Sequence, residues 1–128
     1  MKQNILVIED NTETRECMSE LLTLEGFNVS TSEDGSLALI QLVSNLPDLI
    51  ICDIHMPVMD GFEFFSHLKS NPRIRNIPFM FSTTKSEPMD IQKAKALGVD
   101  YYLIKPFDGV DLLTTINSVL KIRQSSDG

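Results

Sequence analysis

The chain has 128 residues, of which 42% are hydrophobic and 23% charged, and it carries a net charge of −7 at pH 7. These values are typical of one globular domain that can bury a core without cross-links, and they exclude a disordered chain. The basic residues are scattered, which argues against direct nucleic-acid binding, and no apolar run approaches the ~18 residues of a membrane span.

Short apolar runs alternate along the chain with longer segments of helical periodicity. The apolar runs predict strands at residues 4–8, 27–32, 48–52, 78–83 and 101–104. The periodic segments predict helices at residues 12–25, 35–45 and 61–70, a fourth from an N-cap at Ser86 to Gly98, and a last one through Leu112, Leu113, Ile116, Val119 and Leu120. The polar residues 123–128 are expected to form a C-terminal tail or linker stub outside a domain of residues 1–122.

The first helix and the two cysteines give expectations for the core. One apolar face of the helix is expected to be buried; it comprises Cys17, Leu21 and Leu24, flanked by Met18 and Leu22. Cys17 and Cys52 lack the spacing of a CxxC pair or a zinc site, so we expect two small buried residues in a reducing compartment. The apolar start of the chain is too short for a signal peptide, and the protein is therefore expected to be cytoplasmic.

Five rounds of strand and helix predict an α/β domain, with a parallel sheet, right-handed crossovers and helices on both faces. In such open sheets the functional site lies beyond the carboxyl ends of the strands. Polar residues end or directly follow four of the strands at this edge: Glu9 and Asp10, Asp53, Ser82 and Thr83, and Lys105. Each residue by itself is typical of a turn or a cap, and Asp10 or Asn11 could cap the first helix. Their joint position at one edge predicts a shared site.

The chemistry of this group points to phosphate. Three neighbouring carboxylates repel one another unless a cation joins them or their pKa values rise. Oxygen ligands favour a hard ion such as Mg²⁺, with Mn²⁺ as an alternative, and Lys105 supplies a second positive charge that can pair with Asp53. Both cations can offset the charge of a phosphoryl group during transfer, and aspartate is a nucleophile that forms acyl phosphates.

Five segments carry a resemblance to a known family: "VIEDN" (7–11), "DGSLAL" (34–39), "DIHMPVMDG" (53–61), "ST" (82–83) and "GVDYYLIKPF" (98–107). On these motifs the chain resembles the CheY-like receiver domain of response regulators over essentially its whole length. The resemblance implies a (βα)5 doubly wound fold of the flavodoxin and CheY type, with a five-stranded parallel sheet in the order 2-1-3-4-5. It also implies a signalling domain that catalyses only its own phosphorylation and dephosphorylation, and not an enzyme with a separate substrate.

The resemblance implies a role for each matching residue. Asp53 would be the phosphoacceptor, which takes its phosphoryl group from the phosphohistidine of a sensor histidine kinase or of a histidine phosphotransfer protein. Thr83 and Lys105 would contact the phosphoryl oxygens, and the peptide bond between Lys105 and Pro106 would be cis. The Mg²⁺ ligands would be Glu9, Asp10, Asp53 and the backbone carbonyl of His55.

The same resemblance implies a two-state switch. Phosphorylation would draw Thr83 inward, Tyr102 would follow, and the face formed by the fourth helix, the fifth strand and the fifth helix would change shape. Ser82 competes with Thr83 for the hydroxyl role, and the spacing from Pro78 favours Thr83.

Two residues lie beside the path of the attacking water in this family. They are His55, two residues after Asp53, and Lys85, two residues after Thr83. We expect both to set the rate of autodephosphorylation.

Three other functions share parts of the pattern. An Asp-nucleophile phosphatase or mutase would need a second Asp where the chain has His55, and a binding-only pseudo-receiver would lack one of the acids or the lysine. A flavodoxin-type cofactor binder would need a phosphate-cradling loop, and "EDNTETR" would repel a flavin phosphate. The sequence leaves open the effector protein or output domain, a phosphorylation-dependent homodimer, and whether the chain is stand-alone or part of a longer protein.

Overall fold

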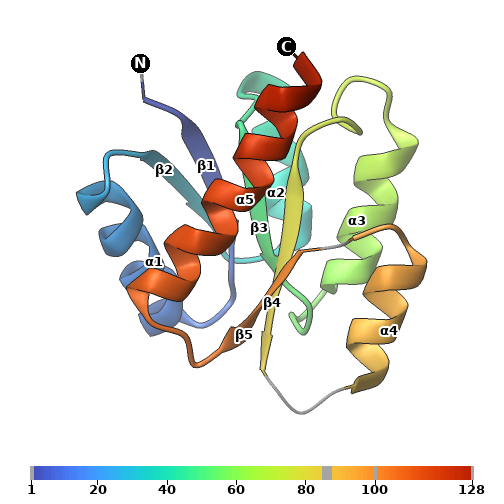
Figure 1. Ribbon diagram of the computed structural model, residues 1–128. Helices are drawn as coiled ribbons and strands as arrows, with labels where there is room; N and C mark the ends of the chain where they lie inside the picture. Colours follow the sequence, from blue (N-terminus) through green and yellow to red (C-terminus); the bar gives the residue numbers. More distant parts are fainter. Residues whose placement is uncertain (1, 85–87, 100, 128) are drawn as a thin grey trace.

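The computed structural model describes residues 2–84, 88–99 and 101–127, with the backbone alone for Thr84 and residues 121–127. Five strands form one parallel sheet in the order β2-β1-β3-β4-β5, which confirms the predicted fold class (Figure 1). The strands are β1 (Asn4–Ile8), β2 (Asn28–Ser32), β3 (Leu49–Asp53), β4 (Phe79–Thr84) and β5 (Tyr102–Lys105). The predicted N-cap Ser86 lies outside the described residues.

Helices cover both faces of the sheet, with α1 and α5 on one face and α2, α3 and α4 on the other (Figure 1). They are α1 (Thr12–Leu24), α2 (Gly35–Ser44), α3 (Gly61–Ser70), α4 (Pro88–Ala96) and α5 (Gly109–Asp127). The last helix is longer than predicted, because no glycine or proline interrupts the sequence between Val110 and Asp127. Residues 123–127, which we expected to form a tail, therefore continue α5.

Each face of the sheet has its own hydrophobic cluster. Ile50 and Cys52 of β3 belong to the cluster under α2, α3 and α4, whereas Leu49 and Ile51 belong to the cluster under α1 and α5. This alternation explains why the segment is apolar throughout. Burial raises the pKa of the Cys52 thiol well above its ordinary value, so this cysteine is an unreactive core residue. Within the described ranges, no helix combines the length and apolarity that a membrane crossing needs.

The buried face of α1 differs from the predicted face. Met18 and Leu22 lie one turn apart and are 1% and 0% exposed, whereas Leu24 is 82% exposed and Cys17 is also exposed. A helix advances by about 100° per residue, so the rotation that buries Met18 and Leu22 turns Cys17 outward. The prediction that Cys17 is buried was therefore wrong. Two apolar stripes overlap in this helix, and only the contact with the sheet selects between them.

Helix caps place three helix starts close to the carboxyl ends of the strands. The capping residues are Asn11, Asp34 and Asp60, whose side-chain oxygens accept amide hydrogen bonds at 2.9, 2.9 and 2.8 Å. Asn11 caps α1, so the carboxylate of the preceding Asp10 does not serve as the cap. The carboxylate of Asp10 is thus left for the site at the end of β1.

Candidate functional site

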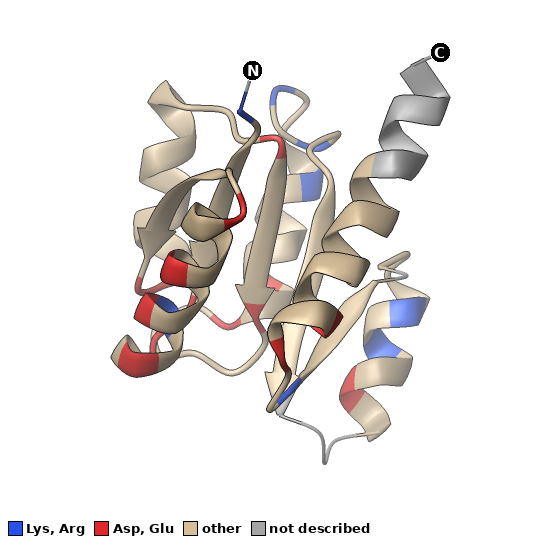
Figure 2. Cartoon of the chain, turned by 60° about the vertical axis from the view of Figure 1, so that its left-hand side comes forward, with Lys and Arg blue, Asp and Glu red and all other residues tan. Residues whose placement is uncertain are grey.

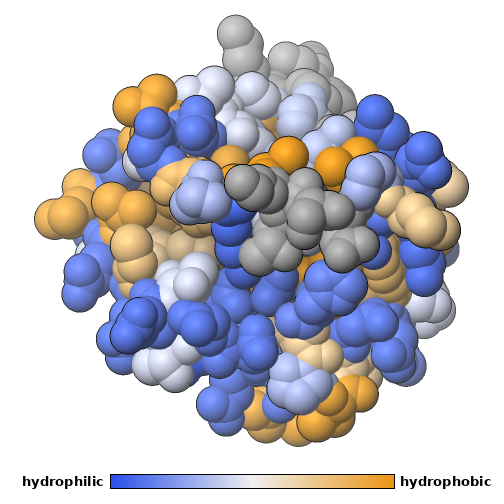
Figure 3. Space-filling view, turned by 90° about the horizontal axis from the view of Figure 1, so that it is seen from below, coloured by the Kyte–Doolittle hydropathy of each residue, from blue (hydrophilic) through white to orange (hydrophobic). Residues whose placement is uncertain are grey.

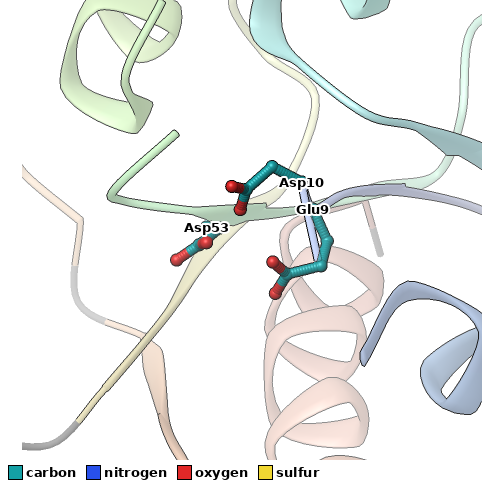
Figure 4. A group of neighbouring side chains, drawn as sticks. All are labelled: Glu9, Asp10 and Asp53. Atoms are coloured by element: carbon teal, nitrogen blue, oxygen red, sulfur yellow. The ribbon is translucent and has the colours of Figure 1, made fainter. Parts of the chain in front are cut away.

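Three acidic side chains meet where β1 and β3 end. Glu9 and Asp10 follow β1, and Asp53 is the last residue of the neighbouring β3. One carboxylate oxygen from each residue lies within 4.8 Å of the other two, and the three side chains converge in the close-up (Figure 4). Acidic residues are concentrated at this end of the sheet (Figure 2), and hydrophilic residues prevail on the described surface seen from below (Figure 3). The structure thus brings together the three acids that the sequence placed at one edge.

The three acids differ in their exposure to water. Glu9 is 1% exposed and Asp53 is 7% exposed, whereas Asp10 is exposed. Burial, together with the nearby charge of Glu9, raises the pKa of Asp53 to about 7, although Lys105 acts in the opposite direction. Asp53 is therefore largely shielded from water although it lies at the carboxyl edge of the sheet. Without a bound cation, the cluster therefore favours a proton on Asp53.

Lys105 brings a positive charge to these acids from the far side of β4. It ends β5, and its Nζ donates to Oε1 of Glu9 and lies 3.5 Å from Oδ1 of Asp53. The peptide bond between Lys105 and Pro106 is cis, the geometry that the family resemblance implied. The sequence suggested Asp53 as the partner of Lys105, and the structure adds Glu9 as a second carboxylate in direct contact with the ammonium group.

Glu9 is fixed by contacts that the sequence analysis missed. The amide of Asn11 donates to Oε2 of Glu9 at 3.2 Å. From the first turns of α1, Nη1 of Arg15 donates to the backbone carbonyl of Glu9 at 2.8 Å and to that of Asp10 at 3.4 Å. The sequence did contain a signal for this contact, because Arg15 lies one turn into the helix that follows Glu9 and Asp10. Arg15 therefore orients the backbone that carries both acids.

The donor set fits a hard divalent cation. All three side chains offer carboxylate oxygens, and Mg²⁺ binds through a few carboxylates while it retains several waters. The exposed Asp10 leaves the cluster open to solvent on one side, which such a hydrated ion requires. Burial and, after it, the charge of Glu9 raise the pKa of Asp53, and a bound cation would offset both by favouring the ionised carboxylate.

The hydroxyl residues of β4 lie on opposite faces of the sheet. Ser82 is the register partner of Asp53, and Ser82 and Thr83 are 1% and 2% exposed. Since side chains alternate along a strand, Thr83 shares a face with Phe81, whose register partner is Tyr102. Tyr102 is half-buried and packs against the cluster under α2, α3 and α4. Thr83 and Tyr102 therefore lie on the same face, as a coupled pair requires.

The loop after Asp53 contains His55, one of the two residues predicted to set the rate of autodephosphorylation. Nε2 of His55 lies 2.6 Å from Oδ2 of Asp90, in the first turn of α4, and the ring remains largely exposed. The sequence analysis assigned no partner to His55, and a contact across 35 positions has no sequence signal. Lys85, the second residue predicted to set this rate, lies outside the described residues.

The remainder of this loop is tightly constrained. The amide of Met59 donates to the carbonyl of Pro57 at 2.7 Å, a γ-turn whose central residue, Val58, has a φ of +69°. At the start of α3, the amide of Gly61 donates to the carbonyl of Ile54 at 2.7 Å. A Cβ on Gly61 would lie 2.4 Å from the carbonyl oxygen of Asp53, so glycine is required for this close approach.

Comparisons with known proteins agree with this geometry. A family model for the response regulator receiver domain matches residues 5–117. The phosphate regulon transcriptional regulatory protein PhoB of Escherichia coli is 35% identical over 121 residues, which cover 94% of this chain and 53% of PhoB. The response regulator PleD of Caulobacter vibrioides is 34% identical over 123 residues, 96% of this chain and 27% of PleD. The chain spans about half, or less, of the length of these relatives.

Solved structures show the same fold. The chemotaxis protein CheY4 of Vibrio cholerae matches with a TM-score of 0.87 and 34% identity, covering 94% of this chain and 100% of that one. The receiver domain of the sensor histidine kinase PA1611 of Pseudomonas aeruginosa matches with a TM-score of 0.86 and 25% identity, covering 94% and 99%. That receiver domain has a magnesium ion coordinated in its active-site cleft.

Because PhoB is a transcriptional regulator, the prediction that the protein has no nucleic-acid partner finds no support among these relatives.

Proposed function

The chain belongs to the family of response regulator receiver domains of two-component systems, and from that premise we propose that Asp53 accepts a phosphoryl group. The donor is the phosphohistidine of a sensor histidine kinase or of a histidine phosphotransfer protein. The observation that supports this proposal is the meeting of three carboxylates and one ammonium group at the ends of β1, β3 and β5. Asp53 lies close to all of these groups, because its carboxylate is within 4.8 Å of those of Glu9 and Asp10 and 3.5 Å from Nζ of Lys105.

The transfer is a single displacement at phosphorus. A carboxylate oxygen of Asp53 attacks, the phosphorus–nitrogen bond of the donor breaks, and its electron pair returns to the imidazole. Glu9, Asp10, Asp53 and the backbone carbonyl of His55 would hold Mg²⁺ or Mn²⁺, and the bound ion supplies positive charge that favours the ionised carboxylate and offsets the phosphoryl oxygens. Lys105 already contacts Glu9 and lies 3.5 Å from Asp53, so a small movement of its ammonium group brings it to the new phosphate.

Phosphorylation changes the face formed by α4, β5 and α5. The new phosphate adds roughly two negative charges and new hydrogen-bond acceptors, and the Thr83 hydroxyl turns toward them. Tyr102, on the same face of the sheet as Thr83, moves into the space that Thr83 leaves. This movement shifts the population between two packings of the domain. It thereby alters the surface of α4, β5 and α5 that an effector protein or a linked output domain contacts. The output can include a nucleic-acid-binding domain, as the name of PhoB suggests.

The domain acts as a signalling switch with one phosphorylation event per cycle, and not as an enzyme with turnover of a separate substrate. His55 and Lys85 set the lifetime of the acyl phosphate. Replacing each with alanine is expected to change the decay rate, and decay identical to the parent would refute this role. The domain boundary at residue 122, the cytoplasmic location and a phosphorylation-dependent homodimer remain predictions from the sequence.

The test is mass spectrometry after incubation with acetyl phosphate and Mg²⁺. The parent chain is expected to gain one phosphoryl group, and Asp53→Asn to gain none. Asp48→Asn is the matched control, because Asp48 is an exposed carboxylate at the opposite end of β3. The proposal fails if the parent gains no mass, or if Asp53→Asn is labelled as well as the control. Continued release of phosphate over many turnovers from a simple phosphomonoester would favour the phosphatase alternative.

A further inference from the structure

Helix α4 is attached to the domain by few buried contacts. Of its nine residues, all of them described, Ala94 alone is buried. Two charged side chains one turn apart provide further contacts: Asp90 reaches His55, and Nζ of Lys93 lies 4.4 Å from the centre of the Phe62 ring. Both contacts are made with segments that follow Asp53, namely the loop after β3 and the first turn of α3. The position of α4 therefore depends on side chains next to the proposed phosphoacceptor.

The contact between His55 and Asp90 has the geometry of a strong hydrogen bond. The distance between Nε2 and Oδ2 is 2.6 Å, within the range of charge-assisted bonds. The Asp90 side chain is only 17% exposed, although the His55 ring is 59% exposed. A carboxylate removed this far from water needs a hydrogen-bond donor, and His55 is the donor in place.

The backbone of His55 is also tied to the sheet. The preceding residue, Ile54, is 1% exposed, and its amide donates to the carbonyl of Ser82 at 3.3 Å. Asp53 and His55 are thus joined by a single buried residue that is fixed between β3 and β4. A change in the loop at Asp53 therefore reaches the His55 ring without a flexible segment in between.

We propose that Asp90 is a positioning residue, and that the His55–Asp90 pair couples the loop at Asp53 to α4. The inference rests on the proposed function, since it names the contact through which phosphorylation of Asp53 would move α4. It also gives the His55 ring a partner on α4, in addition to its proposed effect on the lifetime of the phosphate.

A simpler role for Asp90 is a favourable charge in the first turn of a helix. That role would not involve His55, so the two explanations differ in a double-mutant cycle. If Asp90 acts on the helix dipole alone, Asp90→Asn loosens α4 and His55→Gln does not. If the pair acts as a unit, the two single variants have equal effects and the double variant adds nothing.

The first measurement is backbone hydrogen exchange in the unphosphorylated protein, which requires no phosphoryl chemistry. His55→Gln and Asp90→Asn are each expected to speed exchange in α4 roughly tenfold, as for the loss of one charge-assisted hydrogen bond. Exchange in α2 and α5 should stay as in the parent, and Asp90→Glu should restore part of the protection. His67→Gln is the matched control, since His67 is an exposed histidine of α3. Parent-like exchange of α4 in His55→Gln would overturn the inference.

The second measurement repeats the exchange after labelling with acetyl phosphate and Mg²⁺. In the parent, phosphorylation is expected to change exchange in α4, and in Asp90→Asn this response should be lost while the mass gain on Asp53 persists. A full α4 response in labelled Asp90→Asn would overturn the coupling. Absence of a mass gain in the parent would instead refute the proposed function, and the cycle in the unphosphorylated protein would still decide whether the pair positions α4.

Discussion

Lys105 and Glu9 form a direct ion pair although Lys105 ends β5 and Glu9 follows β1, two strands that are not neighbours in the sheet. Their side chains are 15% and 1% exposed, so the pair crosses the site largely shielded from water. The ammonium group also lies 3.5 Å from Asp53 and thus serves two carboxylates. Removing it should therefore affect folding as well as the proposed phosphorylation.

Lys105→Met tests this balance of charge. In the absence of divalent metal at pH 7, the variant leaves Glu9 buried without a cation, and we expect a loss of about 2–3 kcal/mol in the free energy of unfolding. Urea denaturation in EDTA measures it. Lys95→Met, at an exposed lysine of α4, is the control and should lie within about 0.5 kcal/mol of the parent. Equal stability of the two variants would show that the ion pair between Lys105 and Glu9 does not contribute to the free energy of unfolding.

The raised pKa of Asp53 predicts how stability depends on pH without metal. Its carboxyl group titrates near 3.8 in the unfolded chain and at about 7 in the folded one, so the folded state binds more protons between these values. The free energy of unfolding should therefore fall as pH rises from about 4 to 7, by on the order of 3 kcal/mol. Urea titrations at several pH values in EDTA measure this slope.

Asp53→Asn should remove most of that slope and make the protein more stable at pH 8. The control Glu20→Gln, at an exposed acid of α1, should leave the slope unchanged. In the parent, added Mg²⁺ should restore stability at pH 8, because a bound cation favours the ionised carboxylates. A stability that rises with pH in EDTA, or a slope that survives in Asp53→Asn, would contradict the assignment.

The γ-turn at Val58 predicts a stabilising substitution. A β-branched residue at a φ of +69° is strained, and glycine adopts this conformation without a steric penalty. Val58 is 84% exposed, so its side chain contributes little burial. Val58→Gly should raise the free energy of unfolding by about 1 kcal/mol, measured by urea denaturation. Val43→Gly, at an exposed valine inside α2, should lower the free energy of unfolding by a similar amount. A loss of stability in both variants would contradict the inference that the backbone at Val58 is strained.

Gly61 predicts a change that damages both fold and site. In Gly61→Ala the new Cβ would lie 2.4 Å from the carbonyl oxygen of Asp53, so the start of α3 or the end of β3 must shift. We expect a loss of about 3 kcal/mol in unfolding free energy and slower labelling by acetyl phosphate. In Gly109→Ala the nearest atom lies 3.9 Å away, so stability should be unchanged or higher. Equal behaviour of the two variants would refute the close approach.

The sequence analysis located the acids and the lysine because each directly follows an apolar strand. Parallel strands bring such residues to one edge whatever the details of packing, so Glu9, Asp10 and Lys105 could be assigned to a common site. The order of the strands came from the family resemblance and is confirmed. The family roles of Thr83 and Tyr102 stay predictions, although the structure puts both on one face.

Contacts between distant segments could not be predicted in the same way. The partner of His55 is Asp90, and periodicity carries no information about two polar residues on separate elements. The reach of Arg15 back to the carbonyl of Glu9 depends on the rotation of α1, and so does the exposure of Cys17, which was predicted wrongly. Helix rotation is decided by the side chains that fit against the sheet.

By itself, the sequence determined the alternation of strands and helices and the chemical groups at the carboxyl edge, because both follow from local patterns of apolar and polar residues. Only the tertiary structure decided how deeply Asp53 is buried, which carboxylate Lys105 contacts first, and what holds α4 against the loop. Burial, ion pairs and pKa shifts depend on distances between segments far apart in the chain, and those distances exist only once the sheet has formed.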